Sequence, residues 1–174
     1  AGRAATYAFD SNFLGYGAGE GATNASNSNF LGEAAGTDAT DAQFSDFIGY
    51  NAGAGATNAS FSQFIGDFAG ADSPNAANSI FIGGGAGSSD TVDNTSGAHT
   101  SIAIGEFSGT GGYSDSIALG HGVINSAASQ LNIGNVLYAT GIYGGDDQSA
   151  TPRSAGNVGI GSSTPGSKLS VAGN

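Results

Sequence analysis

Residues 28–44 read SNFLGEAAGTDATDAQF, and this stretch is one copy of a 17-residue unit that recurs along the chain. The unit starts with Ser-x-Phe-[Leu/Ile]-Gly, and in five copies the closing glycine returns at a constant step of 17 residues. An Ala-Gly pair begins three residues after each of these glycines. A fixed period of this length is the signature of a repeat architecture, in which each unit stacks on its neighbours.

The neighbouring positions keep the same step and then loosen. Three later copies, Ser101–Gly105, Ser116–Gly120 and Gln130–Gly134, follow at intervals of 22, 15 and 14 residues. The predicted structural core of the repeat consists of Phe13, Leu14, Gly15, Phe30, Leu31, Gly32, Phe47, Ile48, Gly49, Phe64, Ile65, Gly66, Phe81, Ile82, Gly83, Ile102, Ile104, Gly105, Ile117, Leu119 and Gly120.

These patterns predict an all-β fold, a β-solenoid or β-roll with 17-residue coils. The apolar element is too short for a helix and suits a strand, and glycine permits a tight turn after it. We expect a second short strand in each coil at the Ala-Gly pair. The predicted organisation is a lead-in over 1–10, regular repeats over 11–87, looser repeats with an inserted loop over 88–134, and an irregular transition with a fibre-type end over 135–174.

Alternation within the strand predicts apolar residues on both faces. In the early copies Phe and Leu/Ile fall on opposite faces, whereas Ile102 with Ile104, and Ile117 with Leu119, share one face. A thin coil with two apolar faces predicts a homotrimer, with one face in the coil interior and the other between chains. A monomer with a wider interior remains the alternative.

Composition excludes several functions. Glycine supplies 32 of 174 residues without a collagen period, and ten Phe and six Tyr argue against a disordered chain. The formal net charge of −11 disfavours nucleic acid and anionic lipid surfaces. No apolar run is long enough for membrane insertion, and without Cys there is no disulfide or thiolate metal site.

Two segments resemble known families. Ser101-Ile102-Ala103-Ile104-Gly105 and Ser116-Ile117-Ala118-Leu119-Gly120 resemble the head repeats of trimeric autotransporter adhesins, which implies a trimeric β-roll that binds host surfaces. Gly156–Gly161 and Thr164–Gly173 resemble an element of phage tail fibres and bacterial surface fibres that often precedes an intramolecular chaperone.

No catalytic, cofactor-binding or metal-binding residue is predicted. His99 and His121 are isolated, and no nucleophile with a supporting base is visible. Three acidic sets offer oxygen ligands for Ca²⁺ but keep no fixed position in the repeat, so we interpret them as solvated turn residues: Asp38/Asp41/Asp46, Asp90/Asp93 and Asp146/Asp147.

The sequence therefore predicts a non-enzymatic structural segment of an extracellular fibre or adhesin, located at a cell surface or virion tail. Self-association as a homotrimer, with end-to-end contact in a fibre, is the expected partnership, together with a surface glycan or protein receptor. Two alternatives stay open. One is a phage tail spike that binds or cleaves glycan. The other is an ice-binding solenoid, for which only Thr23, Thr40 and Thr57 align.

Overall fold

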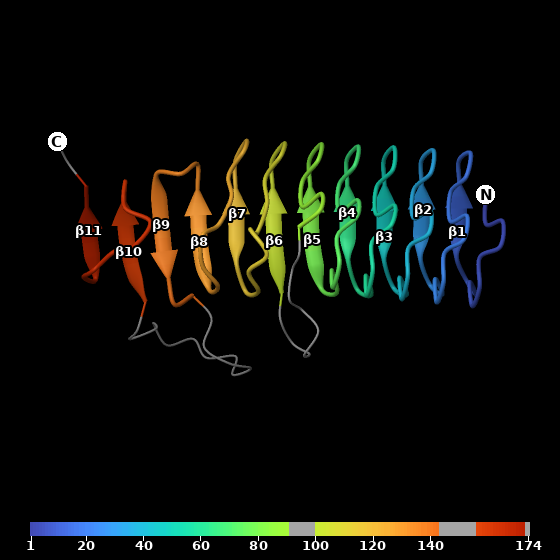
Figure 1. The fold of residues 1–174 in the computed structure, drawn as a ribbon, viewed down its shortest axis with the longest axis horizontal. Helices are drawn as coiled ribbons and strands as arrows, with labels where there is room; N and C mark the ends of the chain where they lie inside the picture. Colours follow the sequence, from blue (N-terminus) through green and yellow to red (C-terminus); the bar gives the residue numbers. More distant parts are fainter. Residues whose placement is uncertain (91–99, 143–155, 173–174) are drawn as a thin grey trace.

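A computed structural model describes residues 1–90, 100–142 and 156–172, and these residues form a β-solenoid with no helix. Its strands stack side by side in one 11-stranded sheet, in chain order from the N-terminus to the C-terminus (Figure 1). The strands are β1 Asn12–Leu14, β2 Asn29–Leu31, β3 Asp46–Ile48, β4 Gln63–Ile65, β5 Ser79–Ile82, β6 Ser101–Ile104, β7 Ile117–Leu119, β8 Gln130–Ile133, β9 Leu137–Thr140, β10 Asn157–Ile160 and β11 Leu169–Val171.

The strand register follows the sequence repeat. β1 to β8 are parallel, and each position pairs with its counterpart in the next copy: Phe13 with Phe30, and Phe30 with Phe47. The uneven intervals are kept as well, since Ile82 pairs with Ile104 and Ile104 with Leu119. The predicted β-solenoid and its 17-residue coil are therefore confirmed, and the looser copies belong to the same stack.

The interior of the early coils is a ladder of phenylalanine rings. Phe30, Phe47, Phe64 and Phe81 are fully buried, and the ring centroids of successive residues lie 4.7–5.0 Å apart. This distance is close to the spacing of hydrogen-bonded strands, so each ring stacks on the ring of the next coil. Burial of one such side chain contributes about 1.5–3 kcal/mol.

A serine ladder runs beside the rings. Ser45 illustrates it: its hydroxyl donates to the carbonyl of Ala59 at 2.6 Å and accepts the backbone N–H of Ser62 at 3.1 Å. Ser28 repeats the same pair of bonds one coil earlier. The buried hydroxyl thus satisfies backbone groups in the next coil, which explains why Ser, and not an apolar residue, stands two positions before Phe.

The far side of the coil is a series of turns, so the prediction of a second strand at the Ala-Gly pair is wrong. Residues 33–38 are turn residues, and only an isolated bridge, Thr6 with Thr23, pairs there in the first coils. Positive φ recurs in the coil 28–44 at Gly32, Ala34, Gly36, Asp38, Asp41 and Phe44. Such frequent left-handed residues break a strand but still allow bonds between coils, such as Gly36 N–H to the Ala52 carbonyl at 2.8 Å.

Two glycine positions are required by contacts. A Cβ on Gly32, which closes β2, would lie 2.3 Å from the carbonyl oxygen of Gly49 in the next coil. A Cβ on Gly36 would lie 2.4 Å from the ring of Phe30 in its own coil. The phenylalanine ring therefore packs against the Ala-Gly pair: Ala35 is buried beside it, and Gly36 leaves space for it.

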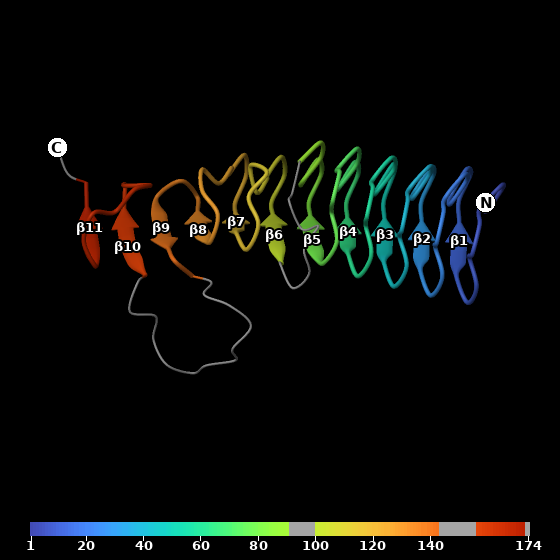
Figure 2. The ribbon, with the colours of Figure 1, turned by 60° about the horizontal axis from the view of Figure 1, so that its bottom comes forward.

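The stretch 135–174, predicted as an irregular transition and fibre-type end, contributes three strands to the sheet. β9 runs antiparallel to both β8 and β10, and β11 pairs in parallel with β10. Figure 2 shows the same single row of strands from a second direction. In the part of the chain that the structure describes, no helix is long and apolar enough to cross a membrane.

Candidate functional sites on the solenoid surface

The predicted repeat core divides between the two faces of the sheet. The Phe residues face the interior, whereas Leu14, Leu31, Ile48, Ile65 and Ile82 alternate with them and face outward. In β6 and β7 the interior positions belong to Ala103 and Ala118, so Ile102, Ile104, Ile117 and Leu119 all lie on the outer face. The glycine that closes each strand lies at the turn.

Over β1 to β4 this outer face is half polar. One column is aliphatic, and the other is Asn12, Asn29, Asp46 and Gln63. The amide of Asn12 donates to Asn29 at 2.8 Å, and that of Asn29 donates to Asp46 at 2.7 Å. These side chains satisfy each other along the fibre axis while remaining in contact with water, so this half of the face needs no partner.

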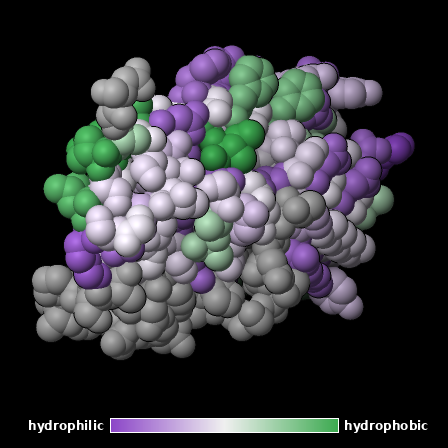
Figure 3. All heavy atoms as spheres, turned by 60° about the vertical axis from the view of Figure 1, so that its left-hand side comes forward, coloured by the Kyte–Doolittle hydropathy of each residue, from purple (hydrophilic) through white to green (hydrophobic). Residues whose placement is uncertain are grey.

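Over β5 to β11 both columns are aliphatic. Because paired residues point to the same side of a sheet, the register defines one continuous surface, here called the aliphatic face. It consists of Ile80, Ile82, Ile102, Ile104, Ile117, Leu119, Leu131, Ile133, Leu137, Ala139, Val158, Ile160, Leu169 and Val171. Ile104 is 39% exposed and Leu169 62%. Figure 3 shows exposed hydrophobic side chains at the C-terminal end.

The aliphatic face spans seven neighbouring strands, or roughly 30 Å at the usual strand spacing. It contains no charged residue. A hollow of about 190 Å³ opens at its margin, lined by Ile102, Ile117, Ile142, Thr100 and Asp115. A contiguous apolar surface of this kind marks an interaction site on a soluble protein.

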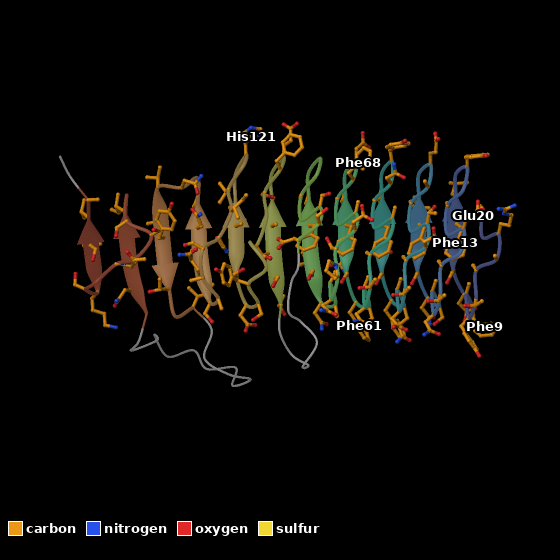
Figure 4. The ribbon with its side chains drawn as sticks, in the orientation of Figure 1. Phe9, Phe13, Glu20, Phe61, Phe68 and His121 are labelled. Atoms are coloured by element: carbon orange, nitrogen blue, oxygen red, sulfur yellow. The ribbon has the colours of Figure 1, made fainter. Side chains whose placement is uncertain are left out.

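A second surface feature is a set of exposed aromatic residues at the two edges of the coil. Phe68 lies at one edge and Phe61 at the other (Figure 4). Phe44, Phe61, Phe68 and Phe107 all have φ between 54° and 59°. A bulky residue in this region costs roughly 1–2 kcal/mol, and the rings are 46–62% exposed, so burial offsets little of that cost.

Two open hollows lie beside the second pair of these rings. One, of about 330 Å³, lies over the coils of β2 to β4 and includes Asp38, Phe68 and Asp72. The other, of about 490 Å³, lies over the coils of β5 to β7 and includes Ser89 and Phe107. Both occupy the part of the coil between the second and the seventh residue after the strand-closing glycine, so they follow one line along the axis.

The acidic residues have separate positions. Asp41 accepts from Asn24 and Asp46 from Asn29, each on its own line of side chains. Asp90 is 8% exposed and accepts from the backbone N–H and hydroxyl of Thr110 and the backbone N–H of Gly112. Among the described residues no three His, Cys, Asp or Glu side chains group as metal ligands. The fixed role of Asp90 between coils was not foreseen.

The remaining residues named in the sequence analysis give less support to a functional site. His121 is exposed and lies 3.4 Å from a carboxylate oxygen of Glu106. Thr23, Thr40 and Thr57 stack as half-buried residues, and Pro74 takes the next position in that line. Asp93, His99, Asp146 and Asp147 lie outside the described residues.

Together, the register, the ring ladder and the turn-built far side define the chain as a β-solenoid repeat protein with one sheet. Comparisons of the chain with protein-family models, with curated proteins and with solved structures found no match.

Proposed function

We propose that this chain is a structural segment of an extracellular fibre or adhesin, in which three copies associate through the aliphatic face. The observation that carries the proposal is the change of the outer face after β4, from half polar to wholly aliphatic. Leaving such a surface in water forfeits about 25 cal/mol for each Å² that a partner would cover.

A copy of the same chain suits the periodicity of this surface. Its side chains repeat along the axis at the strand spacing of about 4.8 Å. A partner can interdigitate with it over seven strands only if its own side chains have the same repeat, and a parallel copy has it. Threefold association is supported by the resemblance of the β6 and β7 repeats to trimeric adhesin heads.

The rest of the surface is suited to exposure to water. Its described residues display no catalytic arrangement. Charged residues make up 10% of the chain, and the turn side is built mainly from Ala, Gly, Ser, Thr, Asn and Asp. A stiff stack of coils with a polar, sparsely charged and acidic exterior extends and presents a surface for attachment.

Light scattering coupled to gel filtration tests the association. We expect the mass of a trimer for the wild type and of a monomer for the double variant Ile104→Asp/Leu119→Asp, which places carboxylates on the aliphatic face. The matched control, Ile48→Asp/Ile65→Asp, changes the same column on the half-polar part and should leave the trimer intact. A monomeric wild type, or equal dissociation in both variants, would overturn the proposal.

A further inference from the structure

We propose that the line of hollows beside Phe68 and Phe107 is a groove that binds a neutral hexose polysaccharide along the axis of the solenoid. The groove lies within a single chain, on the turns that follow the strands, so the proposal does not depend on association through the aliphatic face. It adds a ligand class and a location to the surface that the fibre would present.

The two rings occupy equivalent positions. Phe68 and Phe107 each stand two residues after the glycine that closes their strand, Gly66 and Gly105. They are two coils apart, or about 10 Å at the usual strand spacing. An extended disaccharide covers this distance, so successive pairs of sugars in one polysaccharide strand would meet successive rings.

The ring of Phe107 lies against the surface as a platform. A Cβ on Gly85, in the preceding coil, would come within 2.8 Å of this ring, so the ring rests where only glycine leaves space. One side is thus supported by backbone while the residue remains 62% exposed. Phe68 is held by an edge-on contact with Tyr50, with 5.2 Å between ring centroids. Supported, exposed rings are suited to stacking with the C–H face of a sugar.

Neither the backbone nor the interior calls for phenylalanine here. The equivalent position holds Gly17, Ala34, Asn51 and Gly85 in other coils, and all of them take the same left-handed conformation. Gly and Asn adopt this conformation more readily than Phe. Phe44 and Phe61 are equally strained and exposed, and Phe68 and Phe107 differ from them in lining the two hollows. A ligand in those hollows accounts for a strained, exposed ring at this position of the coil.

The polar groups of the groove select the sugar chemistry. Thr37, Asn51 and Ser88 supply hydroxyl and amide groups, and Asp38 and Asp72 supply carboxylate acceptors for sugar hydroxyls. The described lining residues include no Lys or Arg to meet an acidic sugar. Together with the net charge of −11, these carboxylates repel polyanionic glycans, so the ligand is neutral.

Affinity electrophoresis and titration calorimetry test the groove, with neutral probes (amylose, cello-oligosaccharides, mannan and galactan) and alginate as the acidic probe. We expect the wild type to bind at least one neutral probe and not alginate. The variant Phe68→Asn/Phe107→Asn should bind it roughly tenfold or more weakly, as expected for two lost ring contacts. Asn is compatible with the backbone there, as Asn51 shows.

The control is Phe44→Asn/Phe61→Asn, which removes equally strained, exposed rings that are stacked on each other outside the groove. It should bind like the wild type. Absence of binding to every neutral probe, preference for alginate, or equal loss in both variants would overturn the proposal. The monomeric Ile104→Asp/Leu119→Asp variant should still bind, so failure of association and failure of the groove are distinguishable.

Discussion

In the coils of β1 to β5 Phe fills the interior, whereas in those of β6 and β7 all the bulky apolar side chains of the strand face outward. The outer face of the first group also has a column of Leu and Ile, and it is half polar up to β4 and aliphatic in both columns at β5. In the second group Ala103 and Ala118 face inward, while four Ile and Leu residues face outward. The first group is thus stabilised mainly within the chain. In the second group the apolar side chains lie on the outer face of the sheet, where only another molecule can bury them.

The interior adjusts to this exchange residue by residue. In the early coils the third residue after the strand-closing glycine is a buried alanine, such as Ala69. After β7 the same position holds the larger Val123, which is 1% exposed. Where no ring needs space, the glycine of the Ala-Gly pair is no longer required. After β7 the equivalent position is Ile124, which pairs with Gly109. Close packing requires such compensation, because a lost ring must be replaced by other atoms or by a narrower coil.

The largest effect expected of a single substitution is on the phenylalanine ladder. Phe47→Ala removes a fully buried ring between two stacked neighbours, so it should lower the free energy of unfolding by about 3–5 kcal/mol. The adjacent Ile48→Ala, on the outer face of the same strand, should cost much less because Ile48 is 37% exposed. Urea unfolding of both variants measures this. Similar losses would contradict the assignment of stability to the interior of the early coils.

A smaller effect is expected at Asp90, which joins the two groups of coils. Asp90→Ala leaves the buried N–H of Thr110 without its acceptor, at a cost of about 1–3 kcal/mol. The N–H of Gly112 also loses its acceptor, but it is only part-buried, so water can replace the carboxylate there. Hydrogen exchange should accelerate at these two amides, with little change at β2 to β4. The exposed Asp72→Ala serves as the control, and uniform acceleration along the chain would show that the two groups do not differ in local stability.

The smallest effect concerns salt. Each copy carries a net charge of −11, and the aliphatic face has no ion pair to lose. Raising the salt concentration from about 0.05 to about 0.5 M should therefore strengthen association a few-fold by screening the repulsion between copies. Sedimentation equilibrium measures the change. Weaker association at high salt would indicate ionic contacts between chains in place of the proposed apolar ones.

Much of the fold was predictable from the repeat. Ser28, Phe30 and Gly32 each have equivalents at 17-residue steps, and the strand pairing joins those equivalents. The outer aliphatic face was partly predictable, since alternation placed Ile102 with Ile104. The groove was not, because Phe68 and Phe107 stand outside the strand motif, and only the hollows beside them distinguish them from Phe44 and Phe61.

The sequence by itself determined the period, the place of strands β1 to β8 and their register, because residues that recur at one step must stack when strands pair. Only the tertiary structure decided which face is the interior, that the far side is built of left-handed turns, and that Asp90 bridges two coils. Those features depend on distances between residues of different coils and on the volume left between the strand and its turns. Neither quantity can be read from spacing along the chain.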